Sequence, residues 1–228
     1  MKYIDKSLWS RAELFDFFST VDHPFYSTTF RVDVTQLHKY TKSHGISFYY
    51  ALTYLVTKAI NQVENFRYTI HDGKVALLEE RIPSFTDIKK DSEQFYIVTV
   101  RCQDSMEEFC RVAKEKSHTQ TTFIDQTEEG DELIYMSCLP WLDLTGCTHE
   151  RNLDIDDMIP RITWGKIIAQ NGRETLGMSV EVNHRIIDGV HIGRFYESLQ
   201  KMIDELQVSE CVRLCHRTQP FYICFLTI

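Results

Sequence analysis

The sequence lacks any long hydrophobic run. No window approaches the 18 or so consecutive apolar residues that suggest a membrane-spanning helix. The N-terminal residues 1–6 also lack the apolar stretch of a signal peptide. We therefore expect a soluble, cytoplasmic protein with no membrane partner.

The sequence also lacks cysteine pairs in CxxC spacing. Its seven Cys are an odd number, and a chain of 228 residues is long enough to fold without disulfide staples. Most of them are therefore expected to be reduced thiols. An excess of basic residues is missing as well, since 25 Lys and Arg face 33 Asp and Glu, for a net charge of −8. This balance argues against nucleic acid or an anionic membrane as the partner.

The composition that remains is that of a globular protein. Hydrophobic residues make up 43% and charged residues 25%, and 14 Phe and 11 Tyr supply bulky side chains for a sizeable core. No linker rich in Pro, Gly or Ser and no repeat divides the chain, which predicts a single domain.

Hydrophobic periodicity and turn residues predict a mixture of helices and strands. Two hairpins are expected at the Asp72-Gly73 and Asn171-Gly172 steps, which supply the positive φ of a tight turn. Ser10 is expected to cap the first helix, with Glu13 as its capping-box partner. Helices are expected over 11–18, 35–43, 47–63, 105–116 and 188–206, and strands over 26–34, 66–70, 74–78, 95–102, 133–139, 161–170 and 174–183. This order predicts an α+β fold, a mixed α/β sandwich with helices flanking a large mixed sheet.

The most informative stretch is Val180–Gly189, where an alternating strand runs into a turn and an amphipathic helix. It places His184 at a strand end, where an imidazole of pKa about 6.5 can act as a general base. A structural alternative is a turn in which Asp188 caps the next helix. A third alternative is a metal site on one helical face, formed by His184, Asp188 and His191.

The segment 183–189, NHRIIDG, resembles the HHxxxDG motif of chloramphenicol acetyltransferases and the DHRxxDG motif of dihydrolipoyl acyltransferase catalytic domains. Three further segments are similar to chloramphenicol acetyltransferases: residues 9–11 (WSR), 137–141 (SCLPW) and 159–163 (IPRIT). Together they extend the resemblance over approximately residues 3–205. The separation from Ser137 to His184 also agrees with the family pattern.

The resemblance implies the CoA-dependent acyltransferase fold and an acetyltransferase activity. His184 would take the proton from the acceptor hydroxyl, which attacks the acetyl thioester directly. Ser137 would donate a hydrogen bond to the oxyanion, and Thr163 would help through an ordered water. Asp188 would form an ion pair with Arg11 that holds the catalytic turn. No metal is implied.

The resemblance also implies acetyl-CoA as the acetyl donor and a small hydroxyl-bearing acceptor such as chloramphenicol. Trp141 and Lys166 are candidates to line the channel of the donor, because an aromatic face and a cation suit its pantetheine arm and phosphates. On a chain of negative net charge these phosphates require local cations, such as Arg161, Lys166 or Arg173.

The acceptor site is expected from the family positions at three aromatic residues, Phe18, Phe25 and Tyr26. The family further implies a homotrimer with active sites between subunits, where His184 of one chain meets the acceptor pocket of its neighbour. Residues 1–206 would then form the catalytic domain, and residues 207–228 a C-terminal extension without a counterpart in the family.

The sequence departs from the family pattern near the acceptor, at Phe18, in the loop 24–28 and in two further places. Asn183 stands where the acetyltransferases have the first His of the motif, and residues 142–146 lack the family's aromatic-Ser-Phe run. Two other functions therefore stay open: the catalytic core of a dihydrolipoyl acyltransferase, and a non-catalytic relative that binds a small molecule.

Overall fold

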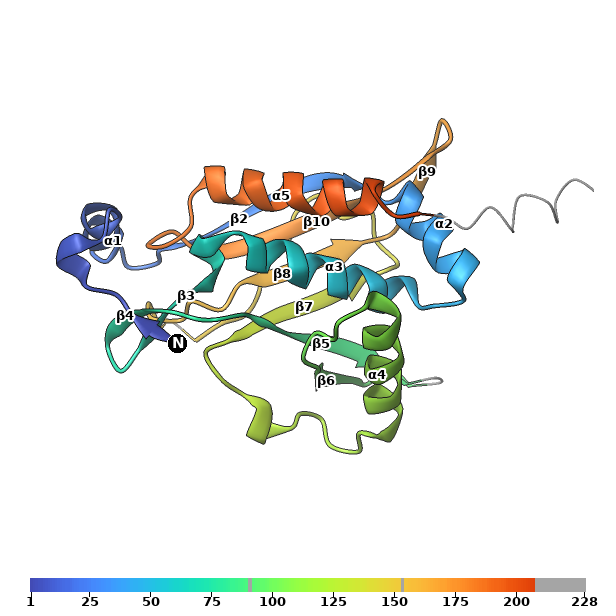
Figure 1. Ribbon diagram of the computed structural model, residues 1–228, viewed down its shortest axis with the longest axis horizontal. Coiled ribbons are helices and arrows are strands. Elements are labelled where there is room, and N and C mark those ends of the chain that lie inside the picture. The colour runs from blue at the N-terminus through green and yellow to red at the C-terminus, as the bar shows by residue number, and fades with distance from the viewer. Residues whose placement is uncertain (90–91, 153, 208–228) are drawn as a thin grey trace, which may run out of the picture.

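A mixed β-sheet of seven strands runs through the centre of the protein (Figure 1). The computed structural model describes residues 1–89, 92–152 and 154–207. Six strands lie in the order β2-β10-β8-β7-β5-β6, and β9 pairs with the start of β10. The bounds are Phe25–Asp33 for β2, Ile82–Ile88 for β5, Phe95–Thr99 for β6, Leu133–Leu139 for β7, Arg161–Gly165 for β8, Ile168–Gln170 for β9 and Arg173–Asn183 for β10.

The pairing directions make this sheet mixed, as predicted. β7 runs parallel to both β5 and β8, whereas the other neighbours are antiparallel. A second, small sheet consists of β1 (Lys2–Tyr3), β4 (Lys74–Leu77) and β3 (Tyr68–His71). Its hairpin turns at Asp72 and Gly73, which have φ angles of 50° and 69°. The predicted hairpin is therefore confirmed.

The helices pack mainly on one face of the large sheet (Figure 1). Helices α3 and α5 cross this face side by side, with α2 and α4 next to α3. A cluster of buried hydrophobic residues fills the space between helices and sheet. Its members come from most of the chain, from Phe15 to Ile203. The helices are α1 (Ala12–Phe18), α2 (Thr35–His44), α3 (Phe48–Gln62), α4 (Met106–Thr119) and α5 (Gly189–Asp204), and short 3-10 turns cover Lys6–Leu8, Glu64–Arg67 and Gln126–Glu128.

The start of α1 differs from the prediction. The N-cap is Arg11, without a side-chain hydrogen bond to the helix, so the expected capping box of Ser10 and Glu13 is wrong. The physical reason is a tertiary contact, because the Arg11 guanidinium binds Asp188, which is 177 residues away in the sequence.

The strand predicted over 161–170 is interrupted. The backbone N–H of Lys166 donates to the Leu142 carbonyl at 2.7 Å, so the loop after β7 replaces a sheet partner at this point. Strand β5 is missing from the prediction, and it contains Pro83, a residue that cannot donate a hydrogen bond to a sheet partner. Pro83 is tolerated as its second residue, since the pairing with β6 begins only at Ser84.

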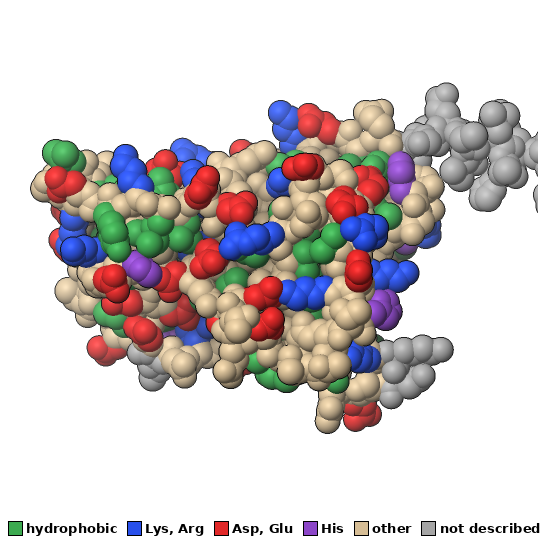
Figure 2. Space-filling view, turned by 60° about the horizontal axis from the view of Figure 1, so that its bottom comes forward, with side chains coloured by type: hydrophobic (Ala, Val, Ile, Leu, Met, Phe, Trp, Pro, Cys, Tyr) green, Lys and Arg blue, Asp and Glu red, His purple; other side chains and the backbone are tan. Residues whose placement is uncertain are grey.

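The end of the chain is only partly described. The expected extension 207–228, including three of the seven Cys, lies outside the described residues after Gln207. Within the described part, Cys102, Cys110, Cys138 and Cys147 are free thiols. No helix in that same part is both long and apolar enough to cross a membrane. Figure 2 shows acidic and basic side chains interspersed over one face of the described surface.

The loop after β7 approaches β10 closely at Gly177. A Cβ on Gly177 would lie 2.0 Å from the carbonyl oxygen of Leu144, so Gly177→Ala should displace the loop. We expect the free energy of unfolding to fall by about 1–3 kcal/mol in urea titrations at one fixed protein concentration. Gly193→Ala in α5 is the matched control, because nothing lies within 4 Å of its Cβ. This control should gain about 1 kcal/mol. Equal stability of wild type and Gly177→Ala would contradict the close approach.

Candidate active site

His184 lies directly after the last residue of β10. Its backbone N–H still pairs with the Pro24 carbonyl at 2.7 Å, beside the end of β2. The next residues leave the sheet, because the N–H groups of Ile186 and Ile187 both turn back to the Asn183 carbonyl. The predicted position of His184 at a strand end is therefore confirmed.

Two aromatic rings hold the imidazole of His184. Phe18 stacks on it with ring centroids 4.0 Å apart, and Tyr26 lies at 4.5 Å. The Tyr26 hydroxyl donates to the Ile187 carbonyl at 3.2 Å, which fixes its ring. The His184 side chain remains 36% exposed, so a ligand can reach it.

Arg11 ties the turn from His184 to Asp188 to helix α1. Its guanidinium donates to both carboxylate oxygens of Asp188, at 2.5 and 2.8 Å. It also donates to the carbonyl oxygens of His184 and Arg185, each at 2.8 Å. Both backbone and side chain of the turn are thereby fixed, and Asp188 comes within 3.4 Å of the His184 Nε2 atom. The ion pair that the sequence predicts between Arg11 and Asp188 is present.

The electrostatics of this turn favour a neutral imidazole. Burial lowers the pKa of His184 below its ordinary value, and the nearby Arg11 lowers it further, while Asp188 acts in the opposite direction. Hydrogen bonds from Arg11 lower the pKa of the Asp188 carboxyl, which therefore stays ionised. At pH 7 the site thus contains a neutral His184, the form that can accept a proton.

Asn183 has a structural role in this fold. It is 3% exposed, and its side-chain amide donates to the carbonyl oxygens of Ile155 and Asp157 at 2.8 and 3.2 Å. Its Oδ1 atom accepts the N–H of Arg185 at 3.0 Å. The residue that replaces the first motif His therefore joins the turn from His184 to Asp188 to the loop before β8.

Ser137 and Thr163 lie side by side on the parallel strands β7 and β8, and Ser179 of β10 continues the row. Among the described residues, the Ser137 Oγ atom accepts one long hydrogen bond, from the Thr86 hydroxyl at 3.4 Å. The hydroxyl hydrogen of Ser137 is therefore available to a ligand. The two predicted residues form one pair of hydroxyl groups at the middle of the sheet.

This pair does not meet His184 within one chain. Ser179 is level with Thr163, and His184 follows it by five residues along β10. At about 3.3 Å per residue this places His184 roughly 16 Å farther along the strand. The structure therefore separates the predicted residues into one group around His184 and another around Ser137.

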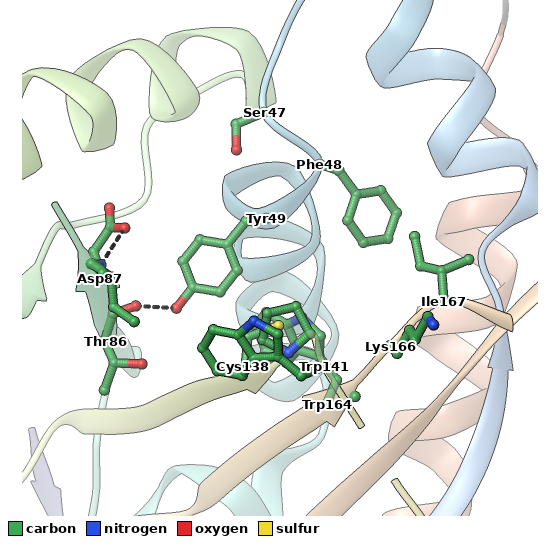
Figure 3. Close-up of a pocket in the computed structure, with 13 residues that line it drawn as sticks. Ser47, Phe48, Tyr49, Thr86, Asp87, Cys138, Trp141, Trp164, Lys166 and Ile167 are labelled. Atoms are coloured by element: carbon green, nitrogen blue, oxygen red, sulfur yellow. Dashed lines mark hydrogen bonds between the residues drawn. The ribbon is translucent and has the colours of Figure 1, made fainter. Parts of the chain in front are cut away.

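A cavity of about 670 Å³ is lined by Cys138 and Trp164, which follow Ser137 and Thr163 along β7 and β8 and face the opposite side of the sheet. Figure 3 shows Lys166 and Ile167 on one side of it, with Thr86 and Asp87 on the other. Trp141 contributes an indole that is 69% exposed. Trp141 and Lys166, both predicted for the donor, thus line one cavity. Its other lining residues are Ser47, Phe48, Tyr49, Ile88, Pro140 and Gly165.

The other cations expected at the donor site lie elsewhere. Arg161 is buried and pairs with Asp157 at 2.9 Å, so it is wrong as a free cation for this cavity. Arg173 lies in the hairpin strand β10, with its Nε atom 3.8 Å from Asp33. Lys166 is the cation among the described lining residues.

The three residues expected to bind the acceptor contact two different side chains, His184 and Arg151. Phe18 and Tyr26 contact the His184 ring, as described above. Phe25 instead lies under the Arg151 guanidinium, whose central carbon is 3.8 Å from the ring centroid. Phe25 and Tyr26 begin β2, and Phe18 ends α1 against the His184 ring.

A buried network of charged side chains lies on the second face of the sheet, the face opposite the helices. The sequence did not predict it as part of the site. Arg151 pairs with Glu181 and Asp157, each at 2.9 Å, and His149 donates its backbone N–H to Glu181. Burial opposes ionisation of Glu181, but these hydrogen bonds and Arg151 outweigh it and lower its pKa to about 2. Nothing in the loop sequence around His149 distinguishes it from a surface loop, so only the fold reveals this network.

The metal alternative has no structural support. Among residues 1–89, 92–152 and 154–207, no group of three or more His, Cys, Asp or Glu side chains is arranged to hold a metal ion. His191 instead accepts the backbone N–H of Asp188 at 2.9 Å through its Nδ1 atom.

Comparison with solved structures identifies the fold class first. The architecture is the CoA-dependent acyltransferase fold, which this chain shares with a probable dihydrolipoamide acetyltransferase from Listeria monocytogenes. That structure aligns at a TM-score of 0.61 with 14% identity, over 92% of this chain and 97% of the other, a likeness of fold alone. A chloramphenicol acetyltransferase structure aligns at a TM-score of 0.81 with 26% identity, over 89% of this chain and all of the other.

Sequence comparison then gives the family. Residues 1–200 match the family model for chloramphenicol acetyltransferase. The chloramphenicol acetyltransferase of Clostridioides difficile is 32% identical over 211 residues, covering 90% of this chain and 97% of that protein. That of Clostridium perfringens is 31% identical over 207 residues, covering 88% and 97%. The chain belongs to the chloramphenicol acetyltransferase family.

The charge of Arg11 should contribute to the lowered pKa of His184. In Arg11→Met the attraction of Asp188 is unopposed, so the pKa of His184 should rise from its lowered wild-type value. Arg11→Lys, the matched control, keeps a positive charge but loses the fork, and its pKa should stay nearer to wild type. NMR titration of the imidazole carbon-bound protons measures both. An unchanged pKa in Arg11→Met would contradict the electrostatic role.

Proposed function

We propose that the protein is an acetyl-CoA-dependent O-acetyltransferase that acetylates a hydroxyl of chloramphenicol or a similar small acceptor. The observation that carries the proposal is the neutral His184 at the end of β10, held by Arg11 and Asp188. Membership of the family supports the choice of acceptor. Residues 1–206 would supply the catalytic domain, and the reaction would take place in the cytoplasm.

In this proposal His184 is the general base. It removes the proton of the acceptor hydroxyl, and the hydroxyl oxygen bonds to the thioester carbonyl carbon. The carbon–sulfur bond then breaks, and His184 returns the proton to the departing thiolate. The products are the acetyl ester and free CoA, without an acyl-enzyme. Phe18 and Tyr26 orient the imidazole for both proton transfers.

Ser137 and the cavity lined by Cys138 and Trp164 would both serve the acetyl donor, from the two sides of the sheet. The free hydroxyl of Ser137 donates a hydrogen bond to the oxyanion that forms at the carbonyl, and Thr163 acts through an ordered water. Lys166 and Trp141 would bind the phosphates and the pantetheine arm, because the cavity is large and carries one cation beside an exposed indole. No metal takes part in this chemistry.

The separation of Ser137 from His184 supports a homotrimer with sites between subunits. One chain offers a base on one side and an oxyanion donor roughly 16 Å away along β10. A neighbouring copy would bring its own His184 to this donor, and closed rotational symmetry would repeat the site around the ring. The acceptor would then lie against Phe18, Phe25 and Tyr26, with its hydroxyl between two chains.

Thiol release from acetyl-CoA tests the activity. Wild type should release CoA when chloramphenicol or another hydroxyl acceptor is added, and His184→Ala should lose about 100- to 10,000-fold in kcat. Ser137→Ala should lose about 100- to 1,000-fold. Dihydrolipoamide as a much better acceptor would indicate the acyltransferase core instead. Tight acceptor binding in calorimetry without thiol release would indicate the non-catalytic relative.

Mixed assemblies test the site between subunits. His184→Ala and Ser137→Ala should each lose most of the activity, but a mixed trimer contains interfaces that pair an intact His184 with an intact Ser137. Equal amounts unfolded and refolded together should recover about one quarter of the wild-type activity, because random mixing pairs the two intact residues at that frequency. No recovery, or a monomer in sedimentation, would contradict the interfacial site.

A further inference from the structure

His149 reaches Thr163 across the second face of the sheet. Its Nε2 atom lies 2.6 Å from the Thr163 hydroxyl oxygen, a short hydrogen bond between two side chains. Thr163 is 1% exposed, and the His149 side chain is 16% exposed. Because Thr163 is level with Ser137, this imidazole acts on the hydroxyl beside the proposed oxyanion donor.

Glu181 determines which nitrogen of His149 carries the proton. Its Oε2 atom lies 3.8 Å from His149 Nδ1 and accepts the His149 backbone N–H at 3.0 Å. The Nδ1 atom is buried and has no hydrogen-bond partner among the described residues. A lone pair on Nδ1 would face the lone pairs of a carboxylate, whereas an N–H would be attracted to it. The geometry therefore favours the tautomer with an Nδ1–H, in which Nε2 carries the lone pair.

We infer that His149 is a positioning residue that makes the Thr163 hydroxyl a hydrogen-bond acceptor toward the reacting groups. The inference rests on the proposed function. The hydroxyl hydrogen of Thr163 points to Nε2 of His149, so the Thr163 oxygen turns its free lone pair to a water or to the hydroxyl of the acceptor. Without His149, the hydroxyl rotates among its staggered positions and donates as readily as it accepts.

The position of Glu181 is itself set by the charged network. Arg151 donates to Glu181 from Nε at 2.9 Å and to Asp157 from Nη1 at 2.9 Å, with its side chain 3% exposed. Arg161 donates to the same Asp157 oxygen. Ion pairs in such a buried site are directional and contribute little net stability, which suits a positioning function.

A double-mutant cycle tests the coupling between His149 and Thr163. His149→Leu removes the Nε2 lone pair and should lower kcat about 5- to 10-fold, with the KM for acetyl-CoA changed less than about 2-fold. In the Thr163→Val background the same change should cost less than about 2-fold, because the hydroxyl is already gone. His149→Gln, whose amide oxygen can still accept, should recover part of kcat. His118→Leu on α4 is the matched control and should leave kcat unchanged.

A second measurement is independent of turnover. Nitrogen NMR of labelled histidine should show a His149 imidazole protonated on Nδ1, and the Nε2 signal should shift in Thr163→Val. Wild-type kcat in His149→Leu, an equal loss in both backgrounds or a proton on Nε2 would overturn the inference. A chain that acetylates no acceptor would defeat the proposed function, while the NMR result would still decide the placement of the proton.

Discussion

The fork between Arg11 and Asp188 is the interaction on which the turn from His184 to Asp188 depends. It joins residues 177 positions apart in the sequence, and the same guanidinium binds the carbonyl oxygens of His184 and Arg185. A guanidinium donates its hydrogen bonds in its own plane, so its four bonds fix the geometry of the turn. Because desolvating charges is costly, the pair is better explained by positioning than by stability. It also accounts for the lowered pKa of Asp188 and contributes to that of His184.

The large sheet then divides the chemistry into two parts. Strand alternation sends Val180 and Val182 into the core beneath the helices, while Ser179, Glu181 and Asn183 line the second face of the sheet. The loop before β8 covers this face with charged and polar groups, held by the close approach at Gly177. In the proposed function His184 of one chain lies next to Ser137 and Thr163 of a neighbouring chain. Assembly would then overcome the separation of these residues along β10.

Local chemistry explains what sequence reasoning could predict. Gly45 ends α2 with φ 64°, and the Asn171 and Gly172 pair turns the second hairpin with φ angles of 51° and 76°. Ser47 and Ser105 are the N-cap residues of α3 and α4, and each side chain accepts a backbone N–H of the helix that it precedes. The predicted cap at Ser10 was wrong, because the N-cap of α1 is Arg11, which pairs with the distant Asp188 carboxylate. The strand predicted over 161–170 is interrupted, because Lys166 donates its N–H to the loop after β7 and not to a strand.

The sequence by itself determined the elements, the family motifs and the identity of His184 as a candidate base, because these depend on neighbouring residues and on order along the chain. Only the tertiary structure decided which hydroxyl His149 contacts, what Asn183 holds and how far Ser137 lies from His184. These facts depend on strand register, and register brings together side chains that no local pattern relates. The neutral state of His184 is likewise a product of burial and of two charges that folding places around it.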